Sequence, residues 1–142
     1  MTAADRTKSV FQTDNRKMRP QQSSSWDDLG WSPGQGGARV SKVTVGHQGD
    51  VNAPVIVMVE FPPHAVVPPH SHPSDYVEVI LSGSQQVTGK WHHAGDVRIV
   101  KAGTGYGPLI AGPEGAVVAI VFSSGDMAPT WLSKDSTGAE TE

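Results

Sequence analysis

The chain has 142 residues, a formal net charge of −3 and a sequence pI near 6.0, a size that suits one domain rather than two. The weak negative charge gives no electrostatic reason to expect nucleic acid or an anionic membrane as a partner, and the lack of cysteine excludes disulfides, thiolate metal sites and a catalytic thiol. Gly 16 and Pro 11 interrupt the chain often, which argues against long helices and favours short strands joined by turns.

The start of the chain, MTAADRTKSVFQTDNRK, contains no apolar core of a signal peptide, and no apolar run approaches the length of a membrane span. We therefore expect a cytoplasmic protein with neither a membrane nor a nucleic-acid partner. Residues 1–25 are polar and rich in Ser, Gln and charge, which predicts a flexible N-terminal arm. The folded body is expected over 26–132, and the polar stretch 133–142 is expected to be a disordered tail.

The body shows alternating or continuous apolar character in short runs, and no stretch of ten residues has a convincing helical period. The predicted strands are 38–46, 54–61, 75–82, 84–91, 96–101, 105–110 and 115–123. The connectors are turn-like, among them SG at 82–83 and AGPEG at 111–115. Short strands at regular spacing with Gly/Pro turns indicate an antiparallel sandwich or barrel.

Two of the six histidines, His70 and His72, are separated by one residue. On an extended segment this spacing projects both imidazoles from the same face. Pro68, Pro69 and Pro73 bracket the pair and hold the backbone extended, so less ordering entropy is lost when an ion binds. The pattern predicts two ligands for a first-row metal ion, with an exposed His-Ser-His turn as the alternative.

The strand that follows the histidines continues the same alternation. Its even positions carry Tyr76 and Glu78, whereas the odd positions Val77, Val79 and Leu81 are all aliphatic and suit packing between two sheets. A strand with one apolar face and one face that holds Tyr and Glu, after a pair of His, predicts a barrel interior lined with chemically active groups.

These residues resemble the two sequence motifs of the cupin superfamily, whose members are small jelly-roll barrels. The first motif reads G-x5-H-x-H-x3,4-E-x6-G, and HAVVPPHSHPSDYVEVILSG is similar to it, with His70 and His72 in the histidine positions and Gly83 as the last glycine. The second motif reads G-x5-P-x-G-x2-H-x3-N, and GDVRIVKAGTGYGPLI is similar to it through Gly95 and Gly103.

The chain departs from both motifs at positions that matter for metal binding. In the first motif, His64 stands in place of the opening glycine and Tyr76 in place of the metal-binding Glu. In the second, Lys101 replaces the proline, Tyr106 the metal-binding His and Ile110 the Asn. Both tyrosines of the chain therefore occupy positions where the family has metal ligands, and we interpret them as part of the site.

The resemblance covers roughly residues 38–123 and leaves three interpretations of the altered site. In the first, His70 and His72 bind a metal ion and Glu78 or a tyrosine phenolate completes the set; two imidazoles with a carboxylate form the facial set of non-haem Fe(II). In the second, fewer protein ligands leave positions open for substrate, and a tyrosine transfers a proton. In the third, the metal is lost and the barrel is a binding pocket.

The resemblance implies an all-β fold, a single-domain cupin jelly-roll β-barrel with an extended N-terminal arm, paired as a homodimer. The function expected first is that of a small metal-dependent enzyme, a dioxygenase acting on a small oxygenated organic molecule, with Fe(II) favoured over Zn, Ni and Mn. The expected metal ligands are His70, His72 and Glu78, and Tyr106 and Tyr76 are expected to contact oxygen or substrate. The alternatives are a non-redox lyase, isomerase or cyclase that uses Tyr as acid or base, and a non-catalytic small-molecule-binding barrel.

Three further charged residues enter the hypothesis. Glu60 shares its parity with neighbouring apolar residues and faces either the interior or the solvent, so it is an alternative carboxylate for the site. Arg98 and Lys101 are candidates for a positive charge that would meet an anionic substrate.

Overall fold

The protein is described by a computed structural model over residues 9–11 and 19–132, and the regular secondary structure of this part is β-strand apart from one short 3-10 turn. The strands are β1 (Ser32–Pro33), β2 (Arg39–Thr44), β3 (Val55–Phe61), β4 (Val66–Val67), β5 (His70–Ser71), β6 (Tyr76–Val87), β7 (Lys90–His93), β8 (Val97–Val100), β9 (Leu109–Phe122) and β10 (Thr130–Trp131), with one 3-10 turn, η1, at Gln35–Gly37. The predicted arm lies outside the described residues over 1–8 and 12–18, and the predicted tail lies outside them entirely.

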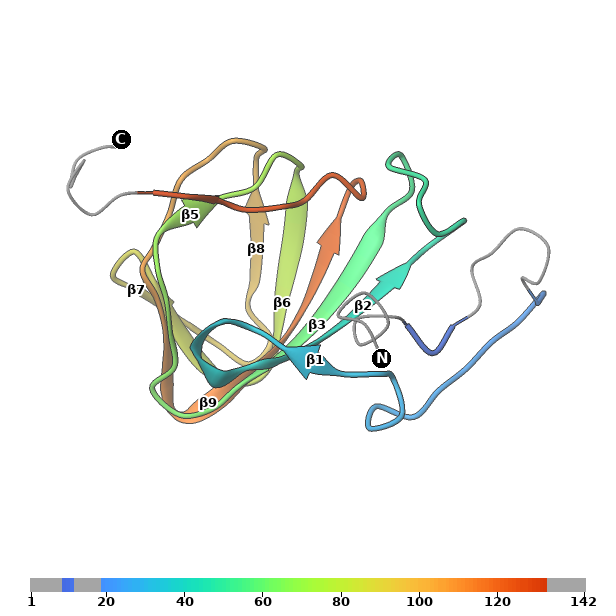
Figure 1. The fold of residues 1–142 in the computed structure, drawn as a ribbon. Coiled ribbons are helices and arrows are strands. Elements are labelled where there is room, and N and C mark those ends of the chain that lie inside the picture. The colour runs from blue at the N-terminus through green and yellow to red at the C-terminus, as the bar shows by residue number, and fades with distance from the viewer. Residues whose placement is uncertain (1–8, 12–18, 133–142) are drawn as a thin grey trace.

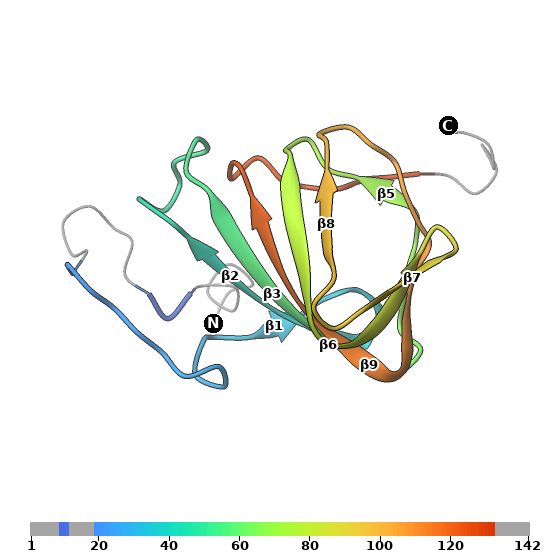
Figure 2. The same ribbon diagram turned by 180° about the vertical axis from the view of Figure 1, so that it is seen from behind.

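Antiparallel pairing joins the strands into one curled sheet and a small second one. The main sheet has the order β1-β2-β3-β9-β6-β7, with β4 added to β9 and β8 added to β6. The second sheet pairs β10 with β5. Both ribbon views show the main sheet curving round, with β5 on the side of the barrel away from β2 (Figures 1 and 2). The prediction of an all-β barrel is therefore confirmed.

No helix long and apolar enough for a membrane span occurs in the described residues.

The longest strands, β6 and β9, are continuous where the sequence predicted turns. The register between them shifts on both sides of Gly83, whose backbone has φ 73°. A Cβ at this position would lie 2.1 Å from the carbonyl oxygen of Gly115 on β9. Gly83 therefore marks a bend with close contact between two strands, and the predicted turn at 82–83 is wrong; the chain reverses at Thr88 and Gly89.

The predicted strand 105–110 is also wrong over most of its length. Strand β9 begins only at Leu109, and Tyr106 forms a single isolated bridge with His70. The two residues exchange backbone hydrogen bonds, each from N–H to carbonyl oxygen at 3.0 Å. This bridge brings Tyr106 to the first histidine of the pair, although 36 positions separate the two in sequence.

The even positions at the start of β6 face the barrel interior, as expected. Tyr76, Glu78 and Ile80 are all buried, and Phe122 and Val118 of β9 pair beside them in the core. The polar and apolar residues of this face thus share one enclosed space, in which burial adds about 25 cal/mol per Å² of apolar surface.

The aliphatic odd positions of β6 face outward. Leu81 is exposed, and the neighbouring Val97 and Ile99 of β8 are 58% and 83% exposed. The expectation that these positions pack between two sheets is wrong, because one sheet closes on itself here and its second face becomes the outer surface.

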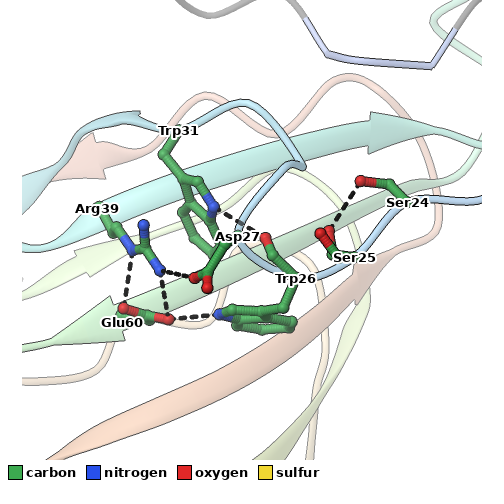
Figure 3. A network of polar contacts seen from close by, with 7 residues as sticks. All are labelled: Ser24, Ser25, Trp26, Asp27, Trp31, Arg39 and Glu60. Atoms are coloured by element: carbon green, nitrogen blue, oxygen red, sulfur yellow. Dashed lines mark hydrogen bonds and ion pairs between the residues drawn. The ribbon is translucent and has the colours of Figure 1, made fainter.

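The segment before β1 is fastened to the outer face of β2 and β3 by a polar network (Figure 3). Arg39 donates from Nε and Nη2 to the two carboxylate oxygens of Glu60 at 2.8 and 2.9 Å, and its Cζ lies 4.1 Å from the centre of the Trp31 ring. The indole N–H of Trp26 also donates to Glu60. Glu60 therefore lies on the outside, away from the interior position considered from sequence, and Arg39 holds its pKa below the usual range.

Candidate functional site

The two histidines are held between three segments at one side of the barrel. His70 lies on β5, opposite Trp131 of β10, and the Tyr106 bridge flanks it on the other edge. His72 follows β5, and its carbonyl accepts a hydrogen bond from the N–H of Gly103 at 2.8 Å. Backbone pairing therefore holds His70 on both edges, and one backbone hydrogen bond holds His72 beside it.

Both imidazoles have the same tautomer. Nδ1 of His70 lies 2.8 Å from the carbonyl oxygen of Pro68, and Nδ1 of His72 lies 2.7 Å from that of Met127. Because a carbonyl oxygen only accepts, each Nδ1 carries the hydrogen and each Nε2 presents its lone pair. Burial lowers the pKa of both histidines, against the opposing effect of the carbonyl hydrogen bonds. Both rings are therefore neutral near pH 7.

The two rings and the two tyrosines form one aromatic cluster. The centres of His70 and His72 are 5.0 Å apart with nearly perpendicular planes, and Tyr106 and Tyr76 lie 4.8 and 5.5 Å from His70 and His72 respectively. The hydroxyl of Tyr106 is 3.2 Å from Nε2 of His70, so it donates to that lone pair. Burial raises the pKa of both tyrosines, so both hydroxyls keep their protons.

Glu78 lies in the same interior, and one of its carboxylate oxygens is held by other residues. It is 3% exposed, and its Oε1 accepts hydrogen bonds from Nε of Arg98 at 2.9 Å and from Nε2 of Gln85 at 2.8 Å. Nη2 of Arg98 also lies 3.4 Å from the hydroxyl of Tyr76, and its Cζ lies 4.9 Å from the centre of the Tyr106 ring. A buried ion pair thus stands behind the tyrosines.

The residues fit a metal ion only in part. Two neutral imidazoles whose Nδ1–H groups are held by carbonyls are the arrangement that metal-binding histidines adopt. In the part of the chain that the structure describes, no three His, Cys, Asp or Glu side chains come together as a metal-binding group. Glu78 is not brought into such a group with His70 and His72, and among the described residues Tyr76 and Tyr106 are the oxygen donors whose rings contact the two imidazoles.

A pocket of about 820 Å³ opens beside the histidines. His70 and His72 line it, whereas Tyr76 and Tyr106 do not. Most of the remaining lining is apolar, with strands β2, β3 and β9 and the segment before β10 as its walls; among these residues are Val55, Val57, Val59, Phe61, Ile120, Phe122 and Met127. A molecule in the pocket would meet the imidazoles directly and the tyrosines only through them.

Two residues near the site were missed by the sequence reasoning. Gln85, fully buried, donates to Glu78 although it lies beyond the bend at Gly83, where the register shift reverses which positions face inward. Lys42 on β2 lines the pocket. Of the cations considered, Arg98 is inside the barrel and Lys101 is exposed at the end of β8.

No model of a known protein family matches the chain, and no curated protein matches it. Solved structures do. An RmlC-like cupin from Shewanella frigidimarina is 19% identical with a TM-score of 0.60, covering 72% of this chain and 89% of its own. An acetylacetone dioxygenase from Acinetobacter johnsonii (14%, TM-score 0.64, 85% and 84%) and a polyketide cyclase from Streptomyces resistomycificus (18%, TM-score 0.63, 83% and 91%) are also similar.

The fold and the inward pair of histidines define a small antiparallel β-barrel with a polar cluster in its interior. Its similarity to these structures shows the fold more specifically: it is the cupin β-barrel, as the two sequence motifs predicted. Since all three are less than 20% identical to this chain, the likeness carries the fold and leaves the chemistry to be argued from the residues.

Proposed function

We propose that the chain is a small metal-dependent enzyme that binds one first-row divalent ion through His70 and His72 and acts on a small oxygenated organic molecule in the adjoining pocket. The reaction that we propose first is that of a dioxygenase with Fe(II), with Zn, Ni and Mn as alternative ions. The observation that carries this proposal is the fixed pair of neutral imidazoles, each with its Nε2 lone pair free of the backbone.

The chain's own residues support this role in three ways. The carbonyls of Pro68 and Met127 hold the tautomer, so no proton has to leave Nε2 before an ion binds. The low pKa of both rings removes competition from protons near pH 7. The apolar walls exclude water from the reacting end of a bound molecule. A bound Fe(II) would supply activation of dioxygen, and Zn(II) or Ni(II) would supply Lewis acidity.

In this proposal the metal has only two protein ligands of the imidazole type, and Glu78 keeps its contacts with Arg98 and Gln85. The remaining coordination positions are open to substrate. Of the interpretations drawn from the sequence, such a site matches the one in which fewer protein ligands leave positions open for substrate, rather than the one in which Glu78 or a tyrosine completes the ligand set. Tyr106 does not line the pocket, and its hydroxyl contacts Nε2 of His70, the atom that the ion would take.

A second candidate function is a non-redox proton-transfer reaction of the lyase, isomerase or cyclase type. The contact that favours it is the hydrogen bond from the Tyr106 hydroxyl to Nε2 of His70 at 3.2 Å. A neutral imidazole that shares a proton with a buried phenol is equipped to take a proton from a carbon next to a carbonyl and to return it. One of the similar structures is a polyketide cyclase, which is compatible with this class of reaction.

The first test is the stoichiometry of metal binding. The purified protein is titrated with Zn(II) and, without oxygen, with Fe(II); one equivalent is expected to bind. His70→Ala and His72→Ala should each abolish binding at micromolar ion, whereas the matched control His47→Ala with His93→Ala, two exposed histidines, should bind as the wild type does. Binding that survives loss of both His70 and His72 contradicts the proposal, and no binding at all leaves the small-molecule-binding barrel.

The second test separates the two reactions. The Fe(II) protein is given acetylacetone and related small oxygenated compounds in a chamber that records oxygen. Oxygen consumed in proportion to product supports the dioxygenase, and the substrate then supplies all the electrons for the two oxygen atoms it gains. Product formed equally well without oxygen supports the proton-transfer enzyme instead.

We also propose that two chains form a homodimer through the outer face of the curled sheet. Aliphatic residues follow one another across five paired strands on this face, in the row Val43, Ile56, Val121, Val77 and Ile99. Exposed apolar residues that lie together on a surface mark interaction sites in soluble proteins, and a row without charged side chains can pair with its own copy across a two-fold axis.

A further inference from the structure

Alternate residues of strand β2 line the pocket, and Lys42 among them is exposed. Val40, Lys42 and Thr44 line the pocket, and Val43 between them lies on the outer face. Lys42 therefore carries an ammonium group on a wall of the pocket, directly opposite the buried Val57 in the strand pairing.

This ammonium group has no counter-charge. The two arginines of the barrel are paired, Arg39 with Glu60 and Arg98 with Glu78. Within the described residues, no carboxylate lies within ion-pairing distance of Lys42. Glu78 and Arg98 belong to the same row of residues paired across the sheet as Lys42, and their two charges cancel each other. The charge of Lys42 is therefore uncompensated in this row.

The groups that face Lys42 across the pocket are neutral or apolar. Both His70 and His72 are uncharged near pH 7, and the strand walls between them and Lys42 are aliphatic and aromatic. The other charged residue of the lining is Asp50, in the loop after β2, whose Oδ1 accepts a hydrogen bond from the N–H of Asn52 at 2.9 Å. The pocket thus has one positive wall, one negative edge and a metal-binding candidate at the opposite side.

We infer that Lys42 binds an anionic group of the substrate, a carboxylate or an enolate, while the apolar body of the molecule lies against β3 and β9 and its oxygenated end reaches His70 and His72. This inference rests on the proposed function, because it takes the histidine side of the pocket as the reacting side. Asp50 disfavours a second negative group in the same pocket, so the substrate class is a monoanion. Lys42 is exposed at the rim of the pocket, so its attraction for a carboxylate is partly screened by water and is strongest at low ionic strength.

The test uses a charged probe and its neutral isostere, hexanoate and hexanamide, whose binding is measured by calorimetry at low salt. The wild type is expected to bind hexanoate roughly tenfold or more tightly than hexanamide, which is the usual advantage of a charge-assisted hydrogen bond. Lys42→Met should remove this preference and leave the hexanamide affinity unchanged. Lys42→Arg should keep most of it, and the control Lys90→Met, at an exposed lysine on β7, should keep all of it.

Two results would overturn the inference: a wild type with no preference for hexanoate, or a Lys42→Met variant that retains it. If Lys42→Met does not fold, Lys42→Gln gives the same comparison, and the shift of hexanoate NMR signals in its presence replaces calorimetry. Metal titration of the same variants separates this inference from the proposed function. One equivalent of Zn(II) bound by Lys42→Met leaves the metal site intact whatever the probes do, whereas a wild type that prefers hexanoate but binds no metal overturns only the metal proposal.

Discussion

The hydroxyl oxygen of Tyr106 lies 3.2 Å from Nε2 of His70, the same nitrogen that we propose as a metal ligand. One lone pair cannot accept a hydrogen bond and bind an ion at the same time, so an ion that binds His70 has to displace the hydroxyl. The tyrosine in this position therefore competes with the metal in the absence of substrate, and after the ion binds its hydroxyl is free to move a proton.

Tyr106→Phe is consequently expected to bind Zn(II) more tightly than the wild type, by about fivefold if the lost hydrogen bond is worth about 1 kcal/mol. The control Tyr76→Phe removes the other buried phenol of the cluster, whose hydroxyl contacts Arg98 and not a histidine nitrogen in the structure, and should change the affinity less than twofold. Calorimetric titration measures both. A weaker affinity in Tyr106→Phe, together with loss of a visible Fe(III)–phenolate band, would instead make Tyr106 a ligand.

The buried pair of Glu78 and Arg98 is expected to matter for stability. Arg98→Met leaves a carboxylate that is 3% exposed without its cation, which should lower the free energy of unfolding by about 3 kcal/mol in urea denaturation. The double variant with Glu78→Gln removes both charges and should recover much of this loss. A double-mutant cycle that gives no coupling between the two positions would contradict the pairing.

Glu78→Gln also tests the carboxylate as a metal ligand. Because Oε1 of Glu78 is occupied by Arg98 and Gln85, this variant should bind Zn(II) within twofold of the wild type. A loss comparable to that of His70→Ala would show that Glu78 leaves Arg98 to complete the metal site, as the sequence suggested. Circular dichroism of the variant at the titration temperature confirms that the comparison is made on folded protein.

The histidine pair should make stability depend on pH. Burial holds the pKa of His70 and His72 in the folded state below the ordinary value of 6.5, so the unfolded chain takes up protons first as the pH falls. The stabilisation is complete above about pH 6.5 and is lost as the pH drops from there towards the folded-state pKa. Urea unfolding between pH 8 and pH 5 should show this slope in the metal-free wild type, and a double variant with His70→Asn and His72→Asn should flatten it. An unchanged slope would mean that the rings are not buried as neutral groups.

The alternation of polar and apolar residues predicted which side chains of β6 face the barrel interior as far as Gly83. From Tyr76 to Ile80 a period of two fixes which side chains face inward, and the structure agrees. At Gly83 the register shifts, and Gln85 faces inward at an odd position. The glycine was visible in the sequence, but whether it ends a strand or bends one depends on the close approach of Gly115. That residue lies on the neighbouring strand β9, far from Gly83 in the sequence.

The partners inside the site were less predictable, because they depend on distances that no spacing records. Parity placed Glu78 correctly in the interior but gave no sign that Arg98 lies beside it, since the pairing of β6 with β8 decides this. Lys42 was overlooked because a lysine on an outer strand of a sheet is ordinarily solvated. The alternation of Val40, Lys42 and Thr44 with Val43 is visible in the sequence. Which of the two sets faces the pocket is known only from the structure.

The proposed dimer gives the last prediction. Ile99 is 83% exposed and Val97 is 58% exposed on β8, where the aliphatic outer face of the sheet reaches its edge. A lysine at either position would place a charge in an interface between two copies, and unpaired charge in an apolar contact costs more than the contact gains. The variant with Ile99→Lys and Val97→Lys is therefore expected to be monomeric at micromolar concentration in light scattering, whereas the wild type is expected to be a dimer.

The matched control is Val66→Lys, which changes a half-exposed aliphatic residue on β4 and should remain dimeric. A wild type that is monomeric at the same concentration, or a double-lysine variant that still pairs, would show that the second chain does not use this face.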